Sequence, residues 1–346
     1  MRWEKLNDKC IFAFLPELEP LFAARNLLLG EPYHQLGAQI YPGEQIAAWK
    51  RRFRFLFETC EAVFKLYEGG LHDLLIDCIA EDLTAARFQR YALSLTPEEL
   101  LWRQSDWEYS GVSRQLLRQA MDDDGALAEL YEKVEAQCPN FLGFSAFVRQ
   151  NERLVRDFFA LAAEMDTSAL REALAEREEK IAALRDRTAE NLKSMEPLAC
   201  AEELMGKCFH NRGPYERFYF LASLMLPFRA MRLFYPNGTA HNRQLLFLAV
   251  REPEPNREKT IAGLMTLADP TRYQILRLLA ERGSVKGQDV ARALKLAPST
   301  VSHHMNALRD AGLVTEEPVK TAKYYGLARD SLRRLSEEIK TDLKLE

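Results

Sequence analysis

Apolar residues recur at intervals of three and four positions through the last quarter of the chain, which predicts a series of short helices. Val301, Met305 and Leu308 fall on one face of a helix that begins at Pro298, and polar residues occupy its other face. Asp269 stands directly before a proline, as an N-cap residue stands before the first helical position. A second helix is therefore predicted to start there.

The same pattern predicts a complete small domain around these two helices. The remaining elements are helices at 260–267 and 288–294, a turn at 295–297, a strand, turn and strand over 314–327 with its tip at 316–321, and a final helix at 331–343. This order is typical of a winged helix-turn-helix, in which the helix after the turn enters the major groove of DNA. The apolar stripe of the final helix needs a partner, either a second subunit or the N-terminal domain.

The first 250 residues are predicted to be mostly helical. Helix-compatible runs cover 17–29, 43–68, 97–104, 112–121, 141–165 and 168–195. Thr96, with a proline after it and a glutamate three positions on, is a strong helix start. The apolar stripe from Ala169 to Lys193 fits a surface helix or helical hairpin arm, and also a dimeric coiled coil.

A small β element is predicted just before a linker. Short apolar, aromatic runs at 218–221 and 245–250 flank the turn signal Asn237-Gly238, which indicates a small sheet or hairpin at about 218–250. Two prolines among charged residues then mark a linker at 253–258. We therefore expect a mainly α protein: a large helical domain at 1–252 for sensing or dimerisation, and an α+β winged helix-turn-helix at 259–346.

Charge distribution supports a nucleic-acid partner for the C-terminal domain alone. The whole chain has a formal net charge of −4, yet residues 257–346 hold 16 Lys/Arg against 12 Asp/Glu. No run of 18 uncharged apolar residues occurs and no secretory signal follows Met1, so we expect no membrane partner and a cytoplasmic location.

Metal, cofactor and enzyme signatures are not found in the sequence. The six cysteines form no C-x-x-C pair and are expected to be reduced and buried, and the spacing of Cys200, Cys208 and His210 fits no usual zinc pattern. No G-x-S-x-G, P-loop, H-E-x-x-H or G-x-G-x-x-G motif occurs, so we expect no enzyme and no cofactor. The acidic run Asp122–Asp124 is expected to be a solvated helix break.

Nine residues are predicted to contact DNA. Hydroxyl and amide side chains near a helix N-terminus reach phosphates or base edges, and lysines of a wing meet the backbone or the minor groove. The predicted set is Pro298, Ser299, Thr300, Ser302, His303, Asn306, Arg309, Lys320 and Lys323. His304 and the pair Tyr324-Tyr325 are expected to pack within the domain rather than to bind bases.

The C-terminal quarter resembles the ArsR/SmtB winged-helix repressors. The resemblance covers about 260–330 and is carried by Leu267–Arg272, Ile275-Leu276, Ser299–Met305, Leu308–Val314 and Tyr324–Leu327. It implies a homodimer on a palindromic operator and transcription controlled by an effector. The chain departs from the family's metal sensors, because Ser284–Asp289 holds no thiol or imidazole and the final helix has no histidine. Ala297 also replaces the polar N-cap often found before the recognition helix.

These observations predict a sequence-specific transcription regulator of ArsR type, and the resemblance implies that it acts as a repressor. The helical N-terminal domain would sense a non-metal effector, such as a small organic molecule enclosed by its aromatic residues. In the alternative, that domain is an enzymatic or protein-docking domain, and the winged helix is a targeting or protein-contact module.

Overall fold

The structure is a computed structural model, and it describes residues 3–30, 35–63, 70–78, 83–104, 107, 111–135, 138, 140–207, 209, 211–226, 230–234, 242–250, 257–319 and 322–343. The chain forms two compact units. Unit 1 comprises Met1–Asp186 and Tyr215–Val250, and unit 2 comprises Arg187–Pro214 and Arg251–Glu346. Residues 187–214 thus group with the C-terminal region, whereas the sequence analysis assigned them to the N-terminal domain.

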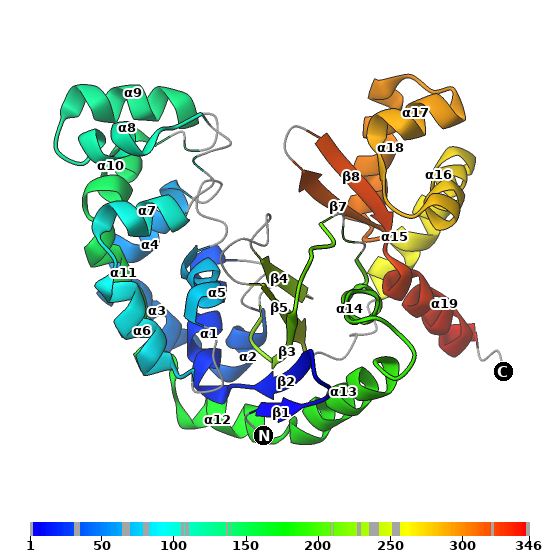
Figure 1. Ribbon diagram of the computed structural model, residues 1–346, viewed down its shortest axis with the longest axis horizontal. Helices are drawn as coiled ribbons and strands as arrows, with labels where there is room; N and C mark the ends of the chain where they lie inside the picture. The colour runs from blue at the N-terminus through cyan, green and yellow to red at the C-terminus, as the bar shows by residue number, and fades with distance from the viewer. Residues whose placement is uncertain are drawn as a thin grey trace. The chain divides into compact units, whose positions relative to one another are not determined.

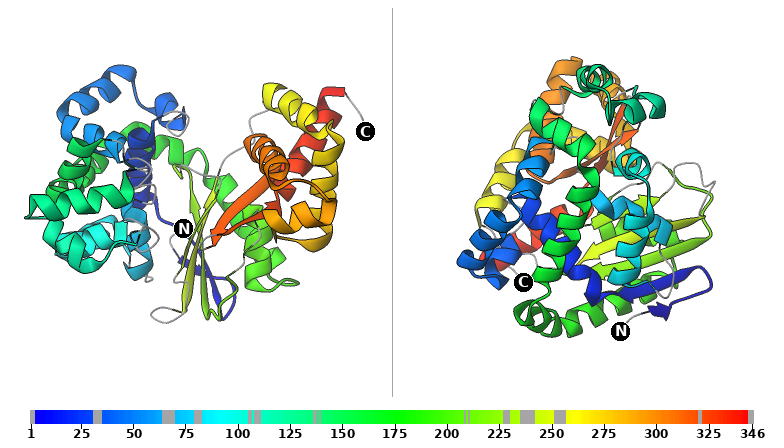
Figure 2. Two further views of the ribbon diagram at one scale, coloured as in Figure 1. Left: turned by 90° about the horizontal axis from the view of Figure 1, so that it is seen from above. Right: turned by 90° about the vertical axis from the view of Figure 1, so that its left-hand side faces the viewer.

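Unit 1 contains a five-stranded mixed sheet in the order β1-β2-β3-β5-β4 (Figures 1 and 2). Its strands are β1 (Trp3–Lys5), β2 (Cys10–Phe14), β3 (Arg217–Ser223), β4 (Ala230–Phe234) and β5 (Arg243–Ala249). The three central strands run parallel, with Phe12 opposite Phe220 and Phe220 opposite Leu246, and the two edge strands are antiparallel to their neighbours. All five residues of β2 are buried, as expected for a parallel strand covered on both faces.

The strand pairing confirms a small sheet at 218–250 and corrects the alternative, a hairpin formed by the two apolar runs. The two apolar runs do form strands, β3 and β5, but they pair in parallel and cannot be the two arms of one hairpin. The hairpin is made by β4 and β5 instead, and the Asn237-Gly238 signal between them lies outside the described residues. The sheet is also larger than predicted, because β1 and β2 join it from the start of the chain.

Helices make up the rest of unit 1, and several predicted helices are interrupted. They are α1 (Glu19–Leu29), α2 (Gln35–Ile40), α3 (Gly43–Arg52), α4 (Arg54–Ala62), α5 (Leu75–Cys78), α6 (Ala85–Ser94), α7 (Pro97–Gln104), α8 (Arg114–Ala120), α9 (Asp124–Val134), α10 (Phe141–Arg149), α11 (Asn151–Met165) and α12 (Ser168–Ala175), with short 3-10 turns at Pro16–Leu18 and Gly70–Leu74. Helix α13 (Glu178–Asn191) begins in unit 1, and its residues after Asp186 belong to unit 2. The predicted helix at 43–68 breaks at Phe53, and the helix at 141–165 breaks at Gln150. Because apolar periodicity continues across both breaks, the sequence alone read each pair as one helix.

Local signals fixed the starts of the helices that were predicted well. Thr96 Oγ1 accepts the backbone N–H of Glu99 at 3.2 Å, and α7 begins at Pro97 as predicted. Asp123 Oδ1 accepts the N–H of Ala126 at 2.7 Å, so the acidic run contains the N-cap of α9. In the predicted coiled-coil stripe, Leu170, Leu174 and Ile181 are buried within the chain, which leaves the hairpin arm as the better description.

Helix α1 anchors the helices of unit 1 to the sheet. The ring of Phe22 meets Phe247 of β5 edge-on, with ring centroids 5.4 Å apart. Glu19 is buried at the start of the helix, and its carboxylate accepts the backbone N–H groups of Leu224 and Met225, which follow β3. These contacts give the buried carboxylate the hydrogen-bond donors that it needs away from water.

Unit 2 holds the winged helix. Its elements are α14 (Pro197–Met205), α15 (Arg257–Leu267), α16 (Pro270–Arg282), β6 (Val285–Lys286), α17 (Gly287–Leu294), α18 (Pro298–Asp310), β7 (Val314–Val319), β8 (Ala322–Leu327) and α19 (Arg329–Leu343). The strands form a three-stranded antiparallel sheet in the order β6-β8-β7. Every helix predicted after residue 259 is present, and β6 was not predicted.

Helix α14 is tied to the last helix of the same unit. The guanidinium of Arg333 on α19 lies 2.5 Å from Glu203 on α14, and Figure 1 shows the two helices side by side. None of the described helices is long and apolar enough to cross a membrane.

Candidate DNA interface

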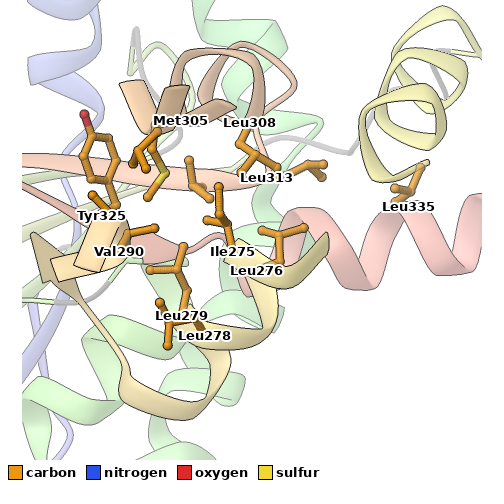
Figure 3. Close-up of a cluster of buried hydrophobic side chains, with 13 residues drawn as sticks. Ile275, Leu276, Leu278, Leu279, Val290, Met305, Leu308, Leu313, Tyr325 and Leu335 are labelled. Carbon is orange, nitrogen blue, oxygen red and sulfur yellow. The ribbon is translucent and has the colours of Figure 1, made fainter. Parts of the chain in front are cut away.

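One face of α18 forms part of the hydrophobic core of unit 2. Val301, Met305 and Leu308 are at most 2% exposed. Figure 3 shows Met305 and Leu308 directed towards Ile275 of α16 and Val290 of α17. Because this face is held on two sides by other helices, the opposite face of α18 must point outward.

The outward face of α18 carries the residues that the sequence predicted to contact DNA. The members of this set on the helix, all of them exposed, are Pro298, Ser299, Thr300, Ser302, His303, Asn306 and Arg309. Small hydroxyl and amide side chains at the first two turns leave room for the helix to approach a groove, while still offering donors and acceptors. The predicted DNA-contact residues of α18 therefore form one continuous exposed face of the helix.

The start of α18 suits an anion. Ala297 occupies the N-cap position and makes no side-chain cap, as expected from its type, and Pro298 has no N–H to satisfy. The turn before it is formed by Lys295 in the left-handed conformation, with φ of 54°. Backbone N–H groups of Ser299 and Thr300 in this uncapped first turn, aided by the helix dipole, can donate to a phosphate oxygen.

The start of α16 is tied to the recognition helix α18. Asp269 Oδ1 accepts the backbone N–H of Arg272 at 2.8 Å, which is the predicted N-cap. This hydrogen bond, aided by the positive charge of Arg272, lowers the pKa of the Asp269 carboxyl. His304 Nδ1 of α18 lies 3.9 Å from the same carboxylate oxygen, and only 15% of the His304 side chain is exposed. His304 therefore packs within the domain, as predicted.

The wing differs from the prediction at its tip. Glu316–Val319, expected in the turn, belong to β7, so the connection between the strands is shorter than predicted. Lys320 and Thr321 lie outside the described residues. Lys323 is on β8 and is exposed. Tyr325 is buried in the core of unit 2, which agrees with its predicted packing role.

Glu316 links the wing to the recognition helix. Its Oε1 lies 2.8 Å from Lys323 Nζ, and its Oε2 lies 3.6 Å from Arg309 Nη1. The Glu316 side chain is 18% exposed, against 41% for Arg309 and 58% for Lys323. Burial, and after it the negative charge of Glu316, raises the pKa of Tyr325, which is the cross-strand partner of Glu316.

Apolar residues remain exposed on α15 and at the end of the final helix, where Leu343 of α19 is 65% exposed. Ile261 is 55% exposed and Met265 is 70% exposed. In contrast, Leu335 of α19 is buried, and Figure 3 shows it pointing at α15, where a Cβ on Gly263 would lie 3.2 Å from it. Leu332, Leu335 and Ile339 of the α19 stripe thus pack within unit 2, whereas the expected partners were a second subunit or the N-terminal domain.

Cysteines and metal ligands show no assembled site among the described residues. Cys10, Cys60, Cys78, Cys138 and Cys200 are buried, as predicted. No group of three His, Cys, Asp or Glu side chains in the described part of the chain is placed to hold a metal ion. Cys208 and His210 of the weak cluster noted in the sequence lie outside the described residues.

These features define a winged helix-turn-helix DNA-binding domain, and comparison with known proteins gives its family. The family model for the arsR family of bacterial regulatory proteins matches residues 269–316. An HTH-type transcriptional regulator of Methanocaldococcus jannaschii is 36% identical over 78 residues, which are 22% of this chain and 88% of that relative. The arsenical resistance operon repressor of Bacillus subtilis is 35% identical over 74 residues, or 21% of this chain and 70% of the repressor. The chain belongs to the ArsR family of transcriptional regulators through this C-terminal domain.

Two solved structures are each similar to about a quarter of this chain. Reduced HlyU from Vibrio cholerae is 26% identical and corresponds to 27% of this chain and 96% of its own, with a TM-score of 0.22. The homodimeric winged helix-turn-helix domain Mb0332 from Mycobacterium bovis is 28% identical and corresponds to 28% and 92%, also with a TM-score of 0.22.

Two features of the interface were missed in the sequence. Glu316 was assigned to the wing tip, although its place opposite Tyr325 follows from a hairpin register that the sequence did not fix. The contact between His304 and Asp269 was also missed, because it joins two helices separated by a third. The signal available for the first was the spacing of two between Val314 and Glu316, which places both side chains on the same face of a strand.

Proposed function

We propose that the chain is a transcriptional repressor that binds a palindromic operator as a homodimer, and that residues 1–252 sense a non-metal effector. The observation that carries DNA recognition is the division of α18 into a buried apolar face and an exposed polar face. The predicted contacts divide by role: Ser302, His303 and Asn306 reach base edges, while Ser299, Thr300, Arg309, Lys320 and Lys323 meet the backbone.

The exposed apolar face of α15 supports the homodimer. Ile261, Leu264 and Met265 lie within two turns of one helix and are each more than 40% exposed. Burying such a patch against a second copy removes apolar area from water. A two-fold dimer would present two α18 helices to half-sites one helical turn apart. Homodimers are also stated for the similar Mycobacterium bovis domain.

Sensing by unit 1 is supported by its size and its separate core. The unit has its own sheet and an interior rich in aromatic side chains, which include Phe22, Phe158 and Phe247. An effector would change DNA affinity only by binding more tightly to one arrangement of the dimer than to the other. A small organic molecule suits an aromatic interior, whereas no thiol or imidazole cluster is assembled in the described residues.

Selection from random duplex DNA tests this function. The full-length protein is used to enrich binding sequences at two salt concentrations. An enriched inverted repeat supports a dimeric, sequence-specific regulator, and a steep salt dependence supports the phosphate contacts. A folded dimer that enriches no sequence, with or without cell-extract small molecules, would instead favour the alternative in which the winged helix contacts proteins.

A further inference from the structure

The carboxylate of Glu316 lies between the two cations that the recognition helix and the wing offer to DNA. Arg309 comes from the last turn of α18 and Lys323 from β8, and Glu316 of β7 reaches both, one through each carboxylate oxygen. Arg309 has a second acidic neighbour, Asp310, whose Oδ1 accepts from Arg309 Nη2 at 3.0 Å. Each cation therefore has an acidic partner within the domain before any DNA arrives.

The position of Glu316 makes it a stronger partner than an ordinary surface acid. Its side chain is 18% exposed, whereas that of Asp310 is 68% exposed. Glu316 Oε2 is buried and faces Arg309 at 3.6 Å, and the Tyr325 hydroxyl is a further hydrogen-bonding neighbour of the same carboxylate. Ion pairs shielded from water are less screened by salt than exposed pairs, so this carboxylate competes with phosphate at ordinary ionic strength.

We propose that Glu316 is a specificity-determining residue: it competes with DNA phosphate for Arg309 and Lys323, and so suppresses binding to DNA of arbitrary sequence. This inference rests on the proposed DNA-binding function. Phosphate contacts supply nearly all of the affinity for non-specific DNA, whereas base contacts add only at the operator. Weakening two phosphate contacts equally on every duplex lowers both affinities but leaves their ratio unchanged. Discrimination arises because the carboxylate also holds Arg309 and Lys323 in fixed positions, so that only a DNA backbone of the right path, as at the operator, reaches both cations.

The amide variant Glu316→Gln tests the proposal, with Glu317→Gln as the matched control. Both remove one negative charge from β7, but neighbouring residues of a strand point to opposite faces. Affinity for a random duplex is measured across a salt series for each protein. We expect Glu316→Gln to raise that affinity about tenfold at low salt and to steepen the slope of log K against log salt by about 1 to 2, one for each released cation. Glu317→Gln, at a residue whose charge acts on Lys207, should change the affinity less than threefold.

Combined substitutions distinguish competition for Arg309 and Lys323 from a general effect of the negative charge of Glu316. The gain from Glu316→Gln should disappear when Arg309 and Lys323 are also changed to Gln, since no competed cation then remains. For the selected operator, the ratio of specific to non-specific affinity should fall in Glu316→Gln. Glu316→Asp, which keeps the charge and shortens the side chain, should move both quantities in the same direction by less. Glu316→Asp also provides the test if Glu316→Gln does not fold.

Several outcomes would overturn the proposal. Equal effects of Glu316→Gln and Glu317→Gln would show that only net charge matters. A folded Glu316→Gln protein that binds every duplex more weakly, with an unchanged salt slope, would show that Glu316 merely supports the wing. If the wild-type protein and Glu316→Gln both fail to bind any duplex, the proposed DNA-binding function fails, and this inference fails with it. Salt-dependent binding by the wild type, without a difference between the two amide variants, would reject this inference alone.

Discussion

His304 Nδ1 on the recognition helix lies 3.9 Å from Asp269 Oδ1, the atom that caps α16. The two residues connect the helix that faces DNA to a helix of the supporting core. Neighbouring His303 is exposed, and its ring meets that of His304 edge-on with centroids 5.8 Å apart. The two adjacent histidines thus differ in burial and in their partners, and their substitutions should have different effects.

Replacing His303 with Ala should relax base preference with little effect on stability, within about 0.5 kcal/mol, because its side chain is exposed. Replacing His304 with Ala should lower the free energy of unfolding by about 1 kcal/mol, since a half-buried contact is lost. Urea denaturation and selection from random duplex DNA measure the two effects. Loss of base preference in His304→Ala, at unchanged stability, would contradict the assignment.

Asp269 should contribute a pH-dependent part of the stability of unit 2. Its pKa is lowered in the folded state from an ordinary value of 3.8, so its contribution is present above about pH 4 and is lost as pH falls through the lower, folded pKa. Asp269→Asn keeps a side-chain acceptor for the N-cap and removes the charge, while Asp269→Ala should cost about 1 kcal/mol. Thermal unfolding between pH 3 and 6 checks this. The stability difference between wild type and Asp269→Asn should shrink as the pH falls. A difference independent of pH would show that the negative charge of Asp269 does not contribute to stability.

The α15 surface should control the oligomeric state. Met265→Lys introduces a charge into the exposed apolar patch and should shift the protein to monomers, since an unpaired charge in a subunit interface is unfavourable. Leu142→Lys is the matched control, because Leu142 is 79% exposed on α10 of unit 1. Sedimentation velocity gives the mass of each. Dimers of unchanged stability in Met265→Lys would place the interface elsewhere.

Gly143 should be intolerant of any side chain. A Cβ at this position of α10 would lie 2.1 Å from Ala62 Cβ at the end of α4, so Gly143→Ala must separate two packed helices. We expect a loss of about 1–3 kcal/mol from this overpacking. Gly43→Ala, where a Cβ meets nothing within 4 Å, provides the control in the same denaturation experiment. Equal stability of both variants would argue against the packing of α10 on α4.

Lys320 should contact the DNA backbone without reading sequence. It follows β7 in the connection to β8, so Lys320→Gln should weaken binding to all sequences similarly and reduce the salt slope by about 1. Binding to the operator and to a scrambled duplex over a salt series measures this. A changed sequence preference in Lys320→Gln would refute the assignment of the wing.

Most of unit 2 could be predicted because its signals are local. The Asp269 cap, the proline at the start of α18 and the spacing of Val301, Met305 and Leu308 each act within one or two helical turns. Local hydrogen bonds and helical periodicity express themselves in neighbouring residues, so they appear in the sequence. The exposed face of α18 therefore follows from its buried face.

Unit 1 was less predictable because its sheet depends on contacts between distant residues. Cys10–Phe14 pairs with Arg217–Ser223 across about two hundred residues of helices, and nothing in the local pattern selects that partner. The same limitation explains why the hairpin was predicted between β3 and β5. Short apolar runs show that a strand is buried, but not which strand lies beside it.

The sequence by itself determined the order of elements in the winged helix, the residues on the outward face of α18 and the family to which the domain belongs. Only the tertiary structure placed Glu316 between Arg309 and Lys323, joined residues 187–214 to unit 2 and left the face of α15 exposed. The physical reason is the range of the interactions: a helix face is set within a few residues, whereas an ion pair between elements depends on how those elements pack.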